Sequence, residues 1–201
     1  MLVRFRDLMG TEVEATDGSL GNAIKFFVNP DDWTLPLVMV GGGRASTGEL
    51  MVPTRTMEGP DERMGQISVP VLRRALVSSR SEVSGSEDHG VFDALRLVGA
   101  RATARGEDLG TVKDLLVNTE RPWDVRYLVV DVDALEPGRE EIFSTDCVRD
   151  LHVERRRTDL DVRTEDVGAC PRCDLREGVE QEYERGLHEH YQKTFHLARF
   201  G

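Results

Sequence analysis

The sequence predicts a mainly β protein of two similar halves, each a small β-barrel, followed by a C-terminal α-helix. The halves are recognised from a repeated segment, SLGNAIKFFVN at 19–29 and DLGTVKDLLVN at 108–118. Leu20 recurs as Leu109 and Gly21 as Gly110, both 89 positions later. The apolar blocks around each copy are four to seven residues long and bounded by Gly, Pro, Asp or Asn, which is typical of short strands.

The start of each half predicts a β-hairpin. Leu8–Gly10 matches Leu97–Gly99, and each leads through a turn-rich segment to the repeated Leu-Gly pair. Gly18 and Gly106 stand in these turns, where a tight hairpin requires a residue with positive φ.

The later strands follow in the same order in both halves. Past the shared asparagine the alignment slips by one residue, so that Trp33 matches Trp123. The predicted strands then pair as 35–40 with 125–130, 50–57 with 141–148 and 66–69 with 159–162. Residues 127–132 are apolar at nearly every position before Asp131, which predicts a central strand covered on both faces. A short sheet of such strands hides its edges by closing into a barrel.

Between and after the halves the sequence changes character. Val71, Leu72, Ala75 and Leu76 fall on one face of a predicted helix that begins at Pro70, because proline fits the first helical turn. A polar segment rich in Ser and Gly follows and predicts a linker. The predicted organisation is 1–80 for the first barrel, 81–91 for the linker, 92–167 for the second barrel and 168–201 for a Cys-x-x-Cys segment with the C-terminal helix.

The order of these motifs, above all LGTVKDLLVN and VRYLVVDV in the second half, resembles the PRC-barrel family. That family includes the cytoplasmic domain of the photosynthetic reaction-centre H subunit and the C-terminal domain of the ribosome maturation factor RimM. The resemblance spans about Val3–Arg80 and Phe92–Val167, and Val52–Pro53 keeps the family's Val-Pro pair. It implies a six-stranded barrel in each half and a binding or docking role, without implying an activity.

The amino-acid composition limits which partners the protein is expected to bind. The 201 residues carry a net charge of −11 and are 39% hydrophobic, so the chain is expected to be globular and to repel phosphate backbones. Direct non-specific nucleic-acid binding is therefore not expected. No apolar run is long enough to span a membrane and the N-terminus lacks the apolar core of a signal peptide, so we expect a cytoplasmic protein without a membrane span.

Three short segments are candidate binding sites, each with a structural alternative. Gly41–Arg44 could cradle a phosphate, but it lacks the Lys-Ser/Thr of a P-loop and is interpreted as a turn between strands. Arg155–Arg157 could contact an acidic partner, but flanking carboxylates favour a solvated turn. Trp33 and Trp123 are candidate partner-binding residues, with caps on the barrel ends as the alternative.

The tail contains a candidate metal site. Cys170 and Cys173 form a Cys-x-x-Cys pair that is typical of zinc ligands. On a helix, His188 and His190 point about 200° apart, whereas Glu184 and His188 share a face and could bind one ion. A second subunit could instead supply another cysteine pair. The alternatives are a redox-sensitive disulfide and two free thiols.

The tail also predicts a partner-binding helix. Between Asp174 and Arg199 apolar residues recur every four positions, so they cover a broad helix face that packs on a barrel or on a partner helix. The candidate partner-binding residues on this face are Tyr183, Leu187, Tyr191 and Phe195.

No catalytic group is predicted, because His152 follows Asp146, Cys147 and Asp150 without the spacing of a nucleophile–base pair. The leading hypothesis is a non-enzymatic scaffold without a cofactor, which self-associates and binds a protein with a basic surface. One alternative is a RimM-like RNA-processing or ribosome-assembly factor that binds a ribosomal protein. Another is a metal- or redox-responsive regulator that works through Cys170 and Cys173.

Overall fold

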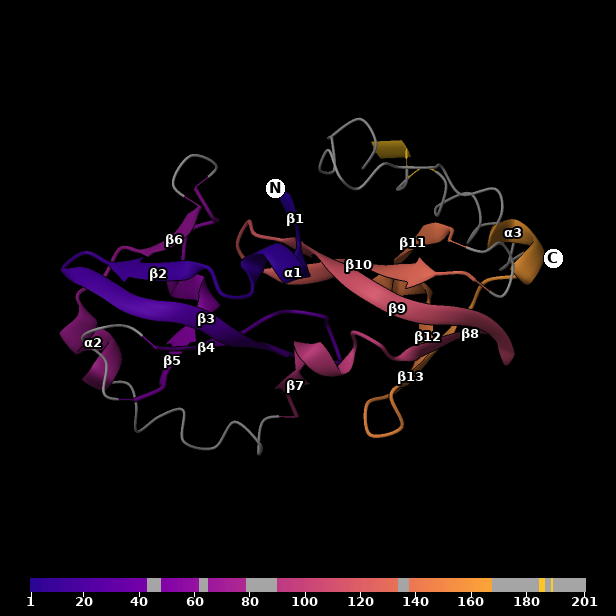
Figure 1. The fold of residues 1–201 in the computed structure, drawn as a ribbon, viewed down its shortest axis with the longest axis horizontal. Helices are drawn as coiled ribbons and strands as arrows, with labels where there is room; N and C mark the ends of the chain where they lie inside the picture. Colours follow the sequence, from indigo (N-terminus) through magenta and orange to yellow (C-terminus); the bar gives the residue numbers. More distant parts are fainter. Residues whose placement is uncertain are drawn as a thin grey trace. The chain divides into compact units, whose positions relative to one another are not determined.

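The protein is mainly β, as the sequence predicts, and its strands form two mixed sheets (Figure 1). The computed structural model describes residues 1–42, 48–61, 65–78, 90–133, 138–167, 185–186 and 189. The predicted C-terminal helix at 174–199 lies outside the described residues apart from three isolated positions, so its aromatic face and its metal ligands have no structural description.

The six-stranded sheet is built from the first half of the chain together with Phe92–Asp93 of the second half. Its strand order is β5-β4-β3-β2-β6, and β7 pairs with β3. All neighbours are antiparallel except β2 and β6, which are parallel. The strands are β2 (Glu12–Ala15), β3 (Gly18–Val28), β4 (Leu37–Gly42), β5 (Leu50–Pro53), β6 (Gln66–Val69) and β7 (Phe92–Asp93).

The seven-stranded sheet repeats this arrangement in the second half, together with Leu2–Arg4 of the first half. Its strand order is β11-β10-β9-β8-β13-β12, β1 pairs with β9, and β8 and β13 are again parallel. The strands are β1 (Leu2–Arg4), β8 (Arg101–Ala104), β9 (Glu107–Asn118), β10 (Asp124–Asp131), β11 (Glu140–Ser144), β12 (Val148–His152) and β13 (Arg157–Leu160).

The described helices are short. They are α1 (Phe5–Leu8), η1 (Thr54–Thr56), α2 (Arg73–Ser78), η4 (Ala94–Arg96), η5 (Thr145–Cys147) and α3 (Thr164–Val167). The helix expected after Pro70 is present as α2, but it begins at Arg73, whose backbone N–H donates to the Asp17 carboxylate at 2.8 Å and so has a capping partner. Leu72 therefore precedes the helix and is exposed, whereas Leu76 is buried. No helix in the described part of the chain is both long and apolar enough to cross a membrane.

Repeated glycines have matching backbone conformations in the two halves. Gly10 and Gly99 have φ of 80° and 81°, and Gly21 and Gly110 have φ of 115° and 140°. This region is unfavourable for residues with a Cβ atom. At Gly110 an added Cβ would also lie 1.8 Å from the carbonyl oxygen of Asp131. The repeated sequence therefore encodes a repeated backbone geometry.

Each sheet curls, although neither closes by hydrogen bonds among the described residues. In the seven-stranded sheet the two end strands of the order, β11 and β12, are consecutive in the chain and joined only by η5. Five strand spacings in a flat sheet would separate them by about 24 Å, whereas this connection reaches at most about 15 Å. The end strands must therefore approach each other at η5.

In the six-stranded sheet the chain also turns back after its end strand β5. After β5 and η1, Glu58 donates its N–H to Ser68 and Asp61 donates its N–H to Gln66, at 2.8 and 2.9 Å. This return segment pairs with β6 only through an isolated bridge between Pro60 and Ile67. Proline lacks an N–H donor, which explains why no regular strand matching β12 forms here.

The described chain forms two compact units whose boundary differs from that of the sequence repeat. Unit 1 contains Met1, 3–96 and 116–126, and unit 2 contains the remaining described residues. The segment 116–126 comes from the second repeat but packs in unit 1. The core of unit 1 includes Phe5, Leu8, Val13, Phe26, Leu35, Val38, Val52, Met57, Ile67 and Trp123, and that of unit 2 includes Leu97, Leu109, Leu115, Leu128, Val129, Phe143 and Leu160.

Candidate functional site

The two tryptophan-containing loops pair with each other inside unit 1. The backbone N–H of Leu35 donates to the carbonyl of Trp123 at 2.8 Å, and the N–H of Val125 donates to the carbonyl of Trp33 at 2.9 Å. Between these bonds Thr34 and Asp124 form an antiparallel bridge. Because these residues are equivalent in the two repeats, the pairing is reciprocal.

The repeated asparagine of each loop has a structural role. The side-chain oxygen of Asn29 accepts the N–H of Asp31, and that of Asn118 accepts the N–H of Glu120, both at 3.1 Å. This is the hydrogen bond of an Asx turn, in which a side chain imitates a backbone carbonyl. The shared Val-Asn ending of the repeat therefore marks where each long strand, β3 and β9, turns into its loop.

The two tryptophans differ in environment. The side chain of Trp123 is 1% exposed and stacks on Phe26, with ring centroids 6.3 Å apart. That placement leaves no surface for a partner and matches the structural alternative. Trp33 is partly exposed and has φ of 60°, with its N–H bonded to the carbonyl of Asn29 at 2.9 Å. Of the pair, Trp33 alone presents side-chain surface to solvent.

An arginine-rich surface in unit 2 is the strongest candidate binding site. Arg155, Arg156 and Arg157, here called the arginine turn, join β12 to β13 and are all exposed. Arg156 donates from its guanidinium to the carbonyl of Val98 at 2.6 Å, and Arg157 donates to the hydroxyl of Thr103 at 3.4 Å. Among the described residues none of the three forms an ion pair. Three arginines without an ion-pair partner among the described residues therefore lie together at this turn and at the start of β13, next to the exposed carboxylate of Glu154.

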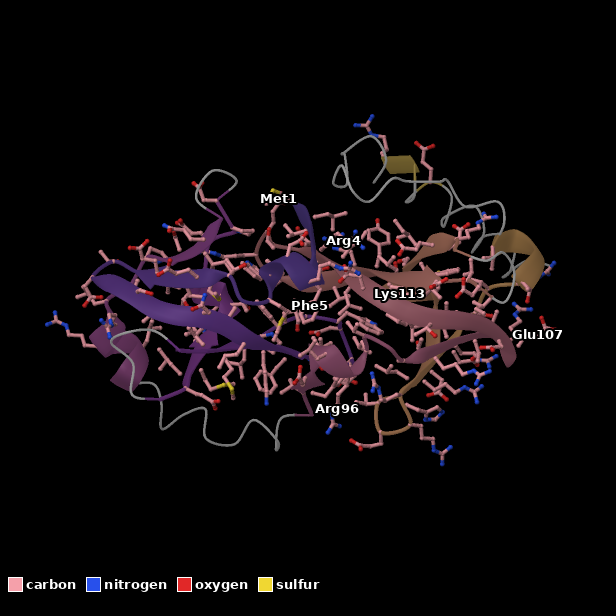
Figure 2. All side chains as sticks on the ribbon, viewed as in Figure 1. Met1, Arg4, Phe5, Arg96, Glu107 and Lys113 are labelled. Carbon is pink, nitrogen blue, oxygen red and sulfur yellow. The ribbon has the colours of Figure 1, made fainter. Side chains whose placement is uncertain are left out.

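The strands on either side of the arginine turn place an arginine and a histidine beside it, each of which contacts a carboxylate. Arg157 lies opposite Arg101 on the parallel strand β8 and opposite His152 on the antiparallel strand β12. Arg101 pairs with Asp108 at 2.6 Å, and His152 contacts Asp150 at 3.0 Å. Figure 2 shows nitrogen-bearing side chains gathered around the orange strands β12 and β13.

Asp159 anchors the base of this surface. Its carboxylate, 5% exposed, accepts the Thr103 hydroxyl at 2.6 Å and the Gly106 N–H at 3.2 Å, and it pairs with Arg149. Burial by itself raises the pKa of Asp159, but the hydrogen bonds and the arginine hold that pKa below its usual value. Asp159 therefore stays charged and fixes β8, β12 and β13 together.

A shallow pocket of about 370 Å³ lies at the opposite end of β8, lined by residues that include Arg105, Glu107 and Arg163. Glu107 is labelled in Figure 2. Arg105 pairs with Asp161 at 3.0 Å, and the Thr164 hydroxyl donates to Glu107 at 2.6 Å. Because carboxylates balance the positive charge, this pocket offers less for an anion than the arginine turn does.

Among the described residues, the other candidates considered from the sequence form no site. Cys147 is 1% exposed in η5, whereas the His152 side chain is 42% exposed on β12. Gly41 and Gly42 end β4, while Gly43 and Arg44 lie outside the described residues, as do Cys170, Cys173, Glu184 and His188. Within the described ranges no three His, Cys, Asp or Glu side chains gather as metal ligands.

Sequence reasoning singled out the arginine turn but not its neighbours. Arg101 is more than fifty residues away in sequence and joins the surface only through the parallel pairing of β8 and β13. No family model matches the chain, and no curated protein matches it either.

Proposed function

We propose that this protein is a non-enzymatic protein-binding module made of two PRC-type barrels in tandem, acting in the cytoplasm. Two observations support the barrel assignment. The two sheets have matching strand orders, and the chain turns back after β5 at η1 and after β11 at η5. The resemblance of the sequence to the PRC-barrel family supports it independently.

The residues that recur between the two halves have structural roles. The repeated glycines satisfy positive φ, the repeated asparagines form turns, and the repeated aliphatic residues are buried. Function then depends on surface that differs between the halves. At the register that aligns β6 with β13, the arginine turn corresponds to Met64, Gly65 and Gln66, so the positive cluster belongs to the second half alone.

One observation carries the proposal. The strand β12 is the last strand of its sheet order and lies beside the arginine turn, whose charges have no ion-pair partner among the described residues. Arginine is among the residue types enriched at protein-binding surfaces, so an exposed arginine cluster of this kind supports a binding role.

Affinity capture from cells that naturally contain the protein tests this function. The full-length chain is compared with Arg155→Glu/Arg157→Glu and with Arg55→Glu, which alters an exposed arginine of unit 1. We expect the wild type and Arg55→Glu to retain a stoichiometric protein partner that the double variant releases. Recovery of nothing beyond a tag-only control would contradict the binding function. Equal retention by all three would leave the binding function and reject this surface.

A further inference from the structure

We infer that an apolar face on the six-stranded sheet of unit 1 binds the C-terminal segment 174–199 of a second copy of this chain. The face, here called the open face, lies on β3, β4 and β5 (Figure 1) and points away from the core of unit 1. It is a different surface from the arginine turn, so this inference goes beyond the proposed function and can fail without it.

The strand register places apolar side chains on the outward side of this sheet as well as on its inward side. Because successive side chains of a strand point to opposite faces, the neighbours of the fully buried Val38 and Val52 point outward. The pairing of β4 with β3 and with β5 extends this outward row across three strands. Its members are all exposed or partly exposed, and they are Ile24, Lys25, Phe27, Leu37, Met39, Met51 and Pro53.

The equivalent face of unit 2 is covered. The paired residues Val129 and Ile142 stand where unit 1 has Met39 and Met51. Val129 is 0% exposed and Ile142 is 3% exposed, whereas both methionines are partly exposed. The same side of the same strands is therefore buried in one unit and open in the other. Because the open face stays partly exposed in the single chain, its occupant comes from another molecule.

Lys25 determines the charge that fits the open face. Its side chain is exposed and has no ion-pair partner among the described residues, and its neighbour across the strands is Met39. An apolar surface with one unpaired cation is complementary to an apolar segment that is bordered by carboxylates. Met39 and Met51 are flexible side chains that adapt their shape to such a segment.

The segment 174–199 has this chemistry. Its described positions Arg185, Gly186 and Glu189 are helical. At about 100° per residue, Glu180 and Glu182 lie on either side of the first half of its apolar stripe. A helix is about 10 Å across and three adjacent strands span about 10 Å, so the helix matches the width of the open face. The stripe consists of Leu175, Val179, Tyr183, Leu187, Tyr191 and Phe195.

A second copy supplies this segment in a reciprocal way. Each chain has both an open face and a segment 174–199, so two chains can exchange their segments and form two equivalent contacts. Such an arrangement closes on itself as a dimer with twofold symmetry, which is the commonest form of soluble oligomer.

Sedimentation velocity of the full-length protein over a range of concentrations tests this inference. We expect a wild-type dimer that Met39→Glu on the face and Leu187→Glu on the segment each weaken at least about tenfold, because a carboxylate enters an apolar contact. Leu72→Glu, which changes an exposed leucine beside the turn between β2 and β3, is the control and should leave the dimer unchanged. Thermal unfolding of each variant by circular dichroism checks that the fold is intact. A wild type that stays monomeric at about 100 μM would overturn the inference.

Mixing the two variants identifies the surfaces that meet. In a mixed dimer the intact segment of the Met39→Glu chain meets the intact open face of the Leu187→Glu chain, so one of the two contacts is restored. We expect the mixture to associate more tightly than either variant alone and more weakly than the wild type. No gain on mixing would overturn the reciprocal contact. Equal weakening by Leu72→Glu would reject the open face in favour of a general charge effect.

Charge reversal tests the role of Lys25. Lys25→Glu should weaken the dimer about twofold to tenfold, because an attraction between exposed charges becomes a repulsion. Adding Glu180→Lys/Glu182→Lys to the same chain should restore the affinity. A dimer that is insensitive to both changes would overturn the charge argument that selects this segment. If the protein is monomeric while affinity capture still recovers a different protein, this inference is wrong and the proposed function stands.

Discussion

Asp159 shows how one buried carboxylate links charge to folding. Its pKa is lowered in the folded protein because Thr103, Gly106 and Arg149 stabilise its charged form more than burial opposes it. A group with a lowered folded pKa stabilises the protein above its unfolded pKa, and that contribution is lost as the pH falls through the folded value. The contribution is therefore complete at neutral pH and disappears below about pH 4.

We predict that Asp159→Asn lowers the free energy of unfolding at pH 7 by about 1–3 kcal/mol, because buried donors lose a charged acceptor. Urea unfolding at a series of pH values from 7 to 2.5 measures this. The difference between variant and wild type should shrink below about pH 4. Asp150→Asn, which alters an exposed carboxylate of β12, is the control. A difference that stays constant across the whole range would contradict the charge-based role.

Gly110 occupies a position that no other residue can take without strain. Its φ is 140° and its missing Cβ leaves room for the backbone oxygen of Asp131. We predict that Gly110→Ala costs more than about 3 kcal/mol, since backbone strain and a backbone clash add. Gly10→Ala, at φ of 80° in open space, should cost only about 1–2 kcal/mol. Equal losses in denaturant unfolding would show that the close approach does not matter.

At the scale of elements, the hairpin 116–126 supplies a core side chain to unit 1. Trp123 stacks on Phe26, whereas Trp33 in the matching loop is partly exposed. We predict that Trp123→Ala lowers the free energy of unfolding by about 3–5 kcal/mol, and that Trp33→Ala costs clearly less. Chemical denaturation of both variants, followed by circular dichroism, provides the comparison. Similar losses would indicate that the two loops are energetically equivalent.

The strands themselves could largely be predicted from sequence. The repeat and the positive φ of Gly18 and Gly106 follow from patterns within a few residues, and the structure confirms them. The predicted match of 66–69 with 159–162 is wrong by two residues, because the parallel pairs β2–β6 and β8–β13 match 66–69 with 157–160. The extended segment that pairs with β6 is different, because Pro60 interrupts it and it forms only an isolated bridge. Local patterns could not predict that β12 is the last strand in the order of its sheet, because strand order depends on long-range pairing.

At the scale of the whole molecule, compact units and sequence repeats do not coincide. Unit 1 includes 116–126 and β7, both of which lie beyond the predicted boundary at residue 80. A fragment that ends at residue 80 therefore lacks the Trp123 side chain and the hydrogen bonds that Leu35 and Val125 make across the loops.

We predict that the fragment 1–80 does not unfold cooperatively, because it buries less apolar surface than unit 1 does in the full chain. Heteronuclear NMR spectra and urea unfolding of the fragment and the full chain test this. The fragment should show poor signal dispersion and no sharp transition. A well-dispersed spectrum with a stability close to that of the full chain would mean that the first repeat folds alone.

The candidate site could likewise be predicted only in part from the sequence, because some of its features depend on long-range contacts. The cluster Arg155–Arg157 is visible in the sequence, where the flanking acidic residues favoured a solvated turn. In the structure Asp159 is buried with Arg149, and Asp161 pairs with Arg105. Neither carboxylate is therefore available to the arginine turn, which the composition of the segment alone could not show.

The sequence by itself determined the mainly β class, the duplication and the turn positions, because each depends on residue types at short and regular spacing. The tertiary structure alone decided that Trp123 belongs to the core of unit 1, that Arg101 lies beside Arg157, and that β12 is the last strand in the order of its sheet among the described residues. These features depend on which distant segments pair, and pairing is selected by the packing of the whole core rather than by any local pattern.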